Sequence, residues 1–117
     1  MGVVASSQHL EQAIAFKVNG DYDAAVAALK ELIATSPDLG EAHRQLGLVY
    51  GFTGEFDASL EELELAVSLD NESIGSRLDL AKTYAMLGMY DEARAGFEYV
   101  LSVDPANEVA KQQLAFF

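Results

Sequence analysis

A short pattern returns three times in this chain at a fixed interval, and that interval restricts the fold more than any other feature. In each copy a glycine is followed two positions later by an aromatic residue. The glycines are Gly20, Gly54 and Gly88, with the same step of 34 between them (54 − 20 and 88 − 54), and the aromatics are Tyr22, Phe56 and Tyr90. Such self-similarity is the signature of a repeat architecture, in which each unit stacks on a neighbour to bury its apolar face.

Each glycine separates two segments that have the apolar periodicity of an amphipathic helix. In the second unit one stripe precedes Gly54 (Leu46, Gly47 and Tyr50) and another follows it (Leu60, Leu63, Ala66 and Val67). Residues at this spacing share one helix face. A glycine ends a helix readily, because it adopts the left-handed conformation without a Cβ clash. Each unit is therefore predicted to be two helices joined by a turn.

The repeat predicts seven helices and no strand. Half of the residues are hydrophobic and only two are proline, a composition that favours packed helices. The predicted helices lie at roughly 6–19, 22–36, 40–53, 56–70, 74–87, 90–103 and 107–116. They form units at about 6–39, 40–73 and 74–107, followed by a capping helix over 108–117, which a solenoid needs at its open end.

The repeated residues resemble the tetratricopeptide repeat family, and the resemblance covers residues 6–117. In the second unit the matching residues are Leu46, Gly47, Tyr50, Gly54, Phe56 and Ser59. In the third they are Leu80, Ala81, Tyr84, Gly88, Tyr90, Ala93, Phe97, Asp104 and Pro105. The first unit matches less well at its start and fully at Gly20, Tyr22, Ala25 and Pro37. The resemblance implies an all-α, right-handed α-solenoid, a single domain over residues 1–117, that binds other proteins.

The tryptophan that the family often has early in the repeat is missing from all three units. His9, His43 and Arg77 stand in its place. Histidines at equivalent positions of two successive units suggest a metal site or a pH-sensitive site. Equivalent positions of stacked helices are about 8–10 Å apart, however, which is too far for one metal ion without other ligands. His43 also falls in the apolar stripe of its helix. We therefore expect a packed, structural histidine, no metal and no cofactor.

Small residues are predicted where paired helices cross. Three of them, Ala25, Ser59 and Ala93, begin the second helices and should face Ala13, Gly47 and Ala81 on the first helices. Small side chains at a crossing let two helices approach closely.

Each first helix carries further apolar residues opposite its core stripe, at about 100° per residue. The predicted groove consists of Leu10, Ile14, Lys17, Arg44, Leu48, Phe52, Leu78, Lys82 and Met86. The resemblance implies that this face is concave and holds an extended or helical peptide. The alternative is a solvated outer face, although six large apolar groups exceed what ordinary surface carries.

Charge is distributed unevenly between the two kinds of helix. The net charge is −12; the first helices and the capping helix carry five Lys or Arg and four Asp or Glu, and the rest carries two and fifteen. Nucleic acid and anionic membranes are therefore not expected as partners. Three groove cations, Lys17, Arg44 and Lys82, are expected either to steer an acidic peptide or only to solubilise the surface.

Some chaperone-binding members of the family hold a C-terminal carboxylate with Lys, Asn and Arg side chains. At the matching positions this sequence has Leu10, Ile14, Gln45, Gly75 and Asp79. That carboxylate clamp is absent, so the resemblance does not extend to binding an Hsp-type tail.

Other function classes have little support in the residues. No cysteine is present, no nucleophile lies beside a base, and the carboxylates are expected on solvated surface, so no enzyme is predicted. No apolar run approaches the ~20 residues of a membrane span. Residues 1–6 lack a signal-peptide pattern, and a cytoplasmic location is expected.

The sequence thus predicts a non-catalytic scaffold that binds a protein or peptide with apolar and acidic residues in its concave groove. The alternative is a structural module that associates with copies of itself through the solenoid ends or the groove. Two adjacent aromatics, Phe116 and Phe117, motivate that second hypothesis.

Overall fold

The computed structural model describes residues 2–117, and for residues 7–117 also the side chains. Met1 and the side chains up to Ser6, on which the signal-peptide comparison rests, lie outside the described residues. Within residues 2–117 the chain forms seven α-helices and no strand. They are α1 (Gly2–Val18), α2 (Tyr22–Thr35), α3 (Gly40–Phe52), α4 (Phe56–Leu69), α5 (Ile74–Met86), α6 (Tyr90–Val103) and α7 (Glu108–Leu114). The all-α prediction is confirmed.

Two helix boundaries differ from the sequence-based prediction by more than one residue. The first helix begins at Gly2 rather than near residue 6, because no proline or other stop signal interrupts residues 2–6. The last helix ends at Leu114 rather than at residue 116. There the N–H groups of Phe116 and Phe117 donate to carbonyls three residues earlier, both at 3.1 Å, so the chain tightens into a final turn.

The predicted helix ends at the three repeated glycines are confirmed. The φ angle is +82° at Gly20, +81° at Gly54 and +79° at Gly88. The N–H of the following residue donates back to the carbonyl five positions earlier, from Asp21 to Phe16 (2.8 Å), Glu55 to Tyr50 (2.9 Å) and Met89 to Tyr84 (2.8 Å). This is the capping bond of a Schellman motif. A Cβ at any of the glycines would meet nothing within 4 Å, so the backbone conformation, and not lack of space, requires glycine.

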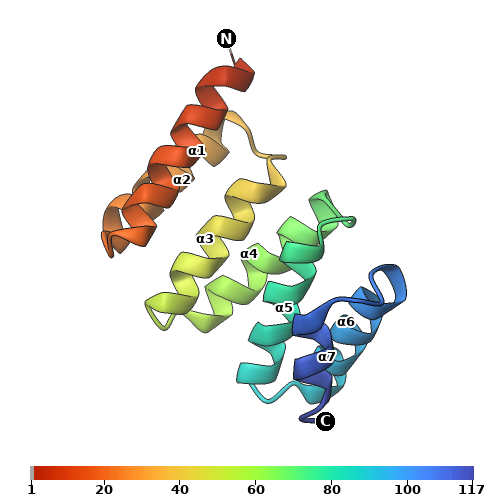
Figure 1. Cartoon of the computed structure of the whole chain (residues 1–117). Helices are drawn as coiled ribbons and strands as arrows, with labels where there is room; N and C mark the ends of the chain where they lie inside the picture. The colour runs from red at the N-terminus through yellow and green to blue at the C-terminus, as the bar shows by residue number, and fades with distance from the viewer. Residues whose placement is uncertain (1) are drawn as a thin grey trace.

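The helices pair into hairpins that stack in sequence order, from red at the N-terminus to blue at the C-terminus (Figure 1). The first helix of each unit packs on the second, as α1 on α2, α3 on α4 and α5 on α6, and α7 packs on α6. The first helices are also neighbours, because α3 contacts both α1 and α5. The body measures 43 × 28 × 21 Å, which is the elongated shape of a short solenoid.

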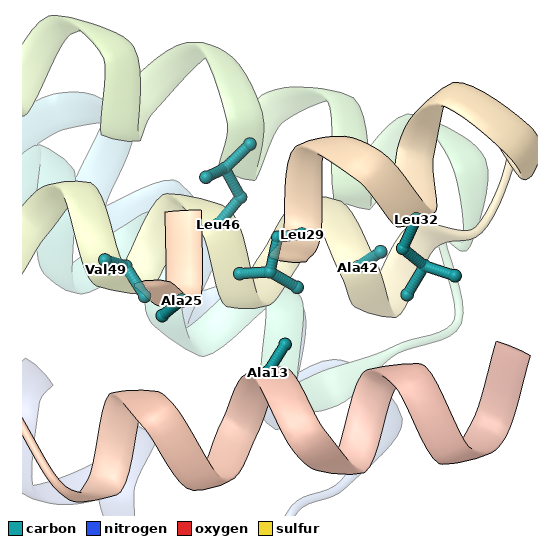
Figure 2. Close-up of a cluster of buried hydrophobic side chains, with 7 residues drawn as sticks. All are labelled: Ala13, Ala25, Leu29, Leu32, Ala42, Leu46 and Val49. Carbon is teal, nitrogen blue, oxygen red and sulfur yellow. The ribbon is translucent and has the colours of Figure 1, made fainter. Parts of the chain in front are cut away.

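The core follows the interfaces between these hairpins. One cluster joins α1, α2 and α3 through Ala13, Ala25, Leu29, Leu32, Ala42, Leu46 and Val49 (Figure 2). A second joins α5, α6 and α7 through Ala81, Ala93, Phe97, Val100 and Ala110. The larger members each contribute on the order of 1.5–3 kcal/mol through burial, and the alanines allow the backbones to approach.

The predicted small-residue crossings are present. Ser59 Oγ donates to the Gly47 carbonyl at 2.7 Å, which ties α4 to α3. A Cβ at Gly47 would lie 2.8 Å from Cγ of Leu63, closer than real contacts allow. The four alanines of the other two crossings (Ala13, Ala25, Ala81 and Ala93) are all buried.

Candidate functional site

The predicted groove residues all lie on the adjacent helices α1, α3 and α5. Two of the apolar ones are strongly exposed, Phe52 at 61 % and Met86 at 60 %. Lys82 is exposed as well, and the other six are partly buried. The face therefore presents apolar side chains to solvent, as the sequence predicts.

The groove residues Leu10 and Leu78 belong partly to the core. Leu10 packs against the cluster of α1, α2 and α3, and Leu78 packs against the cluster of α5, α6 and α7. Each side chain therefore supports its hairpin, and the anchors available to a partner are the more exposed groups at the C-terminal ends of α3 and α5.

Phe52 is neither free nor part of the core. Its ring stacks on Tyr22 of α2, with centroids 5.7 Å apart and an interplanar angle of 27°. Tyr22 in turn packs against the first core cluster. Because one face of the Phe52 ring is held by Tyr22 and more than half of the residue is exposed, the ring is a pre-positioned apolar surface.

A continuous network of side-chain hydrogen bonds links α1, α3 and α5. Lys17 Nζ donates to Gln45 Oε1 at 2.5 Å, and Gln45 Nε2 donates to Glu41 Oε1 at 2.9 Å. Arg44 donates through Nη1 to Glu41 Oε1 at 3.4 Å and through Nε to Asp79 Oδ2 at 2.6 Å. The network links three helices whose residues are far apart in sequence.

Gly75 makes room for this network. A Cβ at Gly75 would lie 2.8 Å from Cζ of Arg44, so the guanidinium rests directly against the glycine backbone. A side chain at this position would displace the guanidinium from Asp79.

Two of the three groove cations, which were expected either to steer an acidic peptide or only to solubilise the surface, are hydrogen-bonded within this network. Burial opposes the charged form of Arg44, yet the hydrogen bond and charge of Asp79 raise its pKa above the ordinary value. Burial, with the repulsion of Arg44, lowers the pKa of Lys17. Lys82 makes no ion pair with any described residue, and it is the groove cation left to face a partner.

Sequence reasoning missed Glu41, Gln45 and Asp79 as members of this face. Gln45 and Asp79 were examined only as departures from the carboxylate clamp. A spacing of 28 residues separates Lys17 from Gln45, and 35 separate Arg44 from Asp79. Only the second spacing is close to the repeat period of 34, so the available signal was the pair of opposite charges at Arg44 and Asp79, about one period apart.

The prediction that His43 is structural is confirmed. The side chain is buried, with the residue 4 % exposed. Its Nε2 donates to the Pro37 carbonyl at 2.8 Å, and its Nδ1 lies 2.6 Å from Glu62 Oε2. Among the residues that the structure describes, no three His, Asp or Glu side chains are placed to hold a metal ion.

The cavities on the surface of the described part include the following three. Two adjoin the positions of the missing tryptophan: one of about 240 Å³ is lined by His9, and one of about 320 Å³ by Arg77. The third, of about 390 Å³, lies between α5, α6 and the end of the chain, and its walls are Ala85, Tyr90, Arg94, Gln113, Phe116 and Phe117.

Comparison with known sequences identifies the repeat. Models of the tetratricopeptide repeat match residues 9–38, 41–73 and 74–95. No curated protein sequence matches the chain.

Solved structures with the same fold include peptide-binding domains. The first tetratricopeptide domain of Spaghetti (RPAP3), bound to the HSP90 peptide SRMEEVD, is 20 % identical, with a TM-score of 0.88 over 94 % of this chain and 87 % of that chain. The second such domain of human RPAP3, in complex with the HSP70 peptide SGPTIEEVD, is 19 % identical, with a TM-score of 0.88 over 98 % and 96 %.

An enzyme also contains a similar segment. The O-GlcNAc transferase of Thermobaculum terrenum is 23 % identical, with a TM-score of 0.86 over 94 % of this chain but only 21 % of that chain. In the part of the present chain that the structure describes, no helix has the length and apolar character of a membrane span.

Proposed function

Because this chain belongs to the tetratricopeptide repeat family, we propose that it is a non-catalytic interaction module that binds a segment of another protein along α1, α3 and α5. The observation that carries the proposal is the exposure of Phe52 and Met86, at 61 % and 60 %, on that one face. Exposed apolar groups gathered on one face of a small protein are typical of an interaction site.

The fold comparison supports a peptide partner. The two RPAP3 domains bind peptides from HSP90 and HSP70 according to their descriptions. These peptides end in a carboxylate, and the corresponding region here is closed by the Arg44–Asp79 pair and the Gln45 hydrogen bonds. A terminal carboxylate would face Asp79 and Glu41, so the proposed ligand is an internal segment.

The proposed ligand contains apolar anchors, because the exposed ends of α3 and α5 offer Phe52 and Met86. Nearby acidic residues of the ligand would face Lys82, which makes no ion pair with the described residues. The net charge of −12 disfavours nucleic acid.

The proposal is tested by peptide selection and a matched pair of variants. Random linear peptides with capped ends are screened, and the affinity of the recovered sequences is compared between wild type, Phe52→Ala and Leu65→Ala. Phe52→Ala should weaken binding by about 2 kcal/mol, as at a binding hot spot, and lower the stability by only about 1 kcal/mol because the ring is stacked but exposed. Leu65, which is exposed on α4, is the control, and its truncation should leave the affinity for peptide unchanged.

Two results would overturn this assignment. A stability loss of Phe52→Ala on the order of 3 kcal/mol or more would make the residue part of the core. NMR shift changes confined to α4 on addition of peptide would place the partner on the opposite face.

A second candidate is self-association, because Phe116 is 84 % exposed at one end of the stack. Phe117 no longer supports this idea as directly, since its ring packs inward against Phe97, with centroids 6.3 Å apart. Two copies with a charge of −12 each also repel one another. A molecular mass in solution equal to a dimer would favour this alternative.

A further inference from the structure

The aromatic cavity at the C-terminal end of the fold, which we call the C-terminal cavity, is a pocket that is open to solvent. Its lining residues are Ala85, Tyr90, Arg94, Gln113, Phe116 and Phe117, and its volume is about 390 Å³. Ligand pockets in proteins begin at about 300 Å³ and are mostly apolar with a few polar groups. The C-terminal cavity has that composition, with three aromatic residues, one guanidinium and one amide.

The floor of the C-terminal cavity is fixed by the core. Phe117 packs edge-on against Tyr90, with ring centroids 6.0 Å apart, and against Phe97. Phe97 is fully buried, so its contact holds the Phe117 ring in place. The rings of Tyr90, 60 % exposed, and of Phe116 form walls that remain open to solvent. A large apolar side chain would gain contact with three aromatic residues here.

Arg94 supplies a charge beside these rings. Its Cζ lies 5.7 Å from the centroid of the Phe117 ring, so the guanidinium is oriented by a cation–π contact. Among the described residues no carboxylate pairs with Arg94. A guanidinium prefers a carboxylate, so the charge of Arg94 is available to an acidic group of a ligand.

The C-terminal cavity continues the face of the proposed function. Ala85 of α5 lines the cavity, and Lys82 and Met86 are on the same helix, one turn earlier and one residue later. Lys82, like Arg94, makes no ion pair with the described residues. Helix α5 thus carries Lys82 and the exposed Met86 close in sequence to Ala85, a residue of the cavity wall.

We propose that the C-terminal cavity is the main anchor site for the partner peptide, binding a large apolar side chain while Arg94 binds an Asp or Glu carboxylate of the same peptide. This inference rests on the proposed function and specifies its ligand. A second copy of this chain is a less suitable occupant, because its net charge of −12 would be repelled as a whole.

The test uses the same capped random peptides, so that no terminal carboxylate contributes. We expect the recovered sequences to combine a large apolar residue with a nearby Asp or Glu. The affinity of one such peptide, and of a copy with Lys in place of its acidic residue, is then measured with wild type, Arg94→Glu and Lys30→Glu. The control Lys30→Glu makes the same charge change at an exposed position of α2.

Arg94→Glu should raise the Kd of the acidic peptide about ten-fold or more, because a charge-assisted hydrogen bond is lost and replaced by repulsion. The same variant should bind the lysine peptide more tightly than wild type does, whereas Lys30→Glu should leave both affinities nearly unchanged. Phe116→Ala should weaken both peptides. Rescue by the exchanged charge cannot result from unfolding.

Three results separate the possible failures. Peptides that lose affinity with Phe52→Ala but not with Arg94→Glu or Phe116→Ala would leave the proposed function standing and overturn the anchor site. Recovery of no peptide at all would overturn both. A dimer that Phe116→Ala converts into a monomer would show that a second copy occupies the cavity, and would overturn the peptide assignment.

Discussion

The middle hairpin, α3 with α4, and the C-terminal hairpin, α5 with α6, achieve the same close packing with the small residue on opposite helices. In the middle hairpin the glycine is Gly47 on the first helix, and a Cβ there would lie 2.8 Å from Leu63. In the C-terminal hairpin it is Gly96 on the second helix, where a Cβ would lie 2.9 Å from the Cβ of Ala81. The helix crossing requires one missing side chain, and either helix can provide it.

The hairpins differ more at the position of the missing tryptophan. His43 closes the middle hairpin, buried and bonded to Pro37 and Glu62. In the C-terminal hairpin, Arg77 lies across the ring of Tyr99, with Cζ 3.8 Å from its centroid, beside a cavity of about 320 Å³. A buried histidine therefore fills this position in the middle unit, whereas the C-terminal unit has open volume on two sides.

The largest expected effect comes from filling the crossing of the middle hairpin. Gly47→Leu should lower the free energy of unfolding by about 3 kcal/mol or more, because the new side chain meets both Leu63 and the backbone oxygen of Ser59. Urea unfolding measures the change. The control is Gly51→Ala on the same helix, where the nearest atom is Ser59 Oγ at 3.5 Å; it should gain roughly 0.5–1 kcal/mol. Equal behaviour of the two variants would contradict the close crossing.

The next effect concerns the position of the missing tryptophan. His43→Ala should lower the free energy of unfolding by about 2–4 kcal/mol, since it leaves a cavity and deprives Pro37 and Glu62 of their partner. Arg77→Ala, at the equivalent position, should lower it by about 1 kcal/mol or less, because the cation–π contact is partly exposed. Thermal unfolding of both variants decides the matter, and a larger loss for Arg77→Ala would reverse the comparison.

A smaller loss than that of Gly47→Leu is expected at the crossing of the C-terminal hairpin. Ala93→Leu should lower the free energy of unfolding by about 1–3 kcal/mol through overpacking. The loss should be smaller than that of Gly47→Leu, because Ala93 already has a Cβ and the substitution adds less volume at the crossing. An unchanged melting temperature would mean that α5 and α6 are not closely packed at Ala93.

Much of the fold was predictable from local chemistry. The three glycines mark helix ends because their left-handed φ is a local preference of glycine. The apolar spacing marks the buried faces, because one turn of an α-helix takes about 3.6 residues in any surroundings. Even the small residues at Gly47 and Ser59 were readable, since consecutive helices of one unit are joined by a short turn that brings these positions together.

The exposure of two groove residues was predictable from the sequence, but the pairing of the groove cations was not. Phe52 and Met86 are exposed on the expected face, whereas Arg44 is engaged by Asp79 and Glu41 rather than free to steer a ligand. Whether a cation is solvated or forms an ion pair with a carboxylate depends on the angle between stacked units and on the side-chain rotamers that this angle permits. Periodicity contains neither quantity.

The order of helices, the turns, the core stripes and the face that carries exposed apolar groups all follow from residues within one repeat, because they depend on backbone preferences and on spacing along the chain. The polar network between Lys17 and Asp79, the placement of Arg44 against Gly75, and the inward turn of Phe117 that forms the C-terminal cavity follow only from the stacked structure. Each requires side chains from different elements to meet, and such contacts are decided by packing across the solenoid rather than by any local sequence preference.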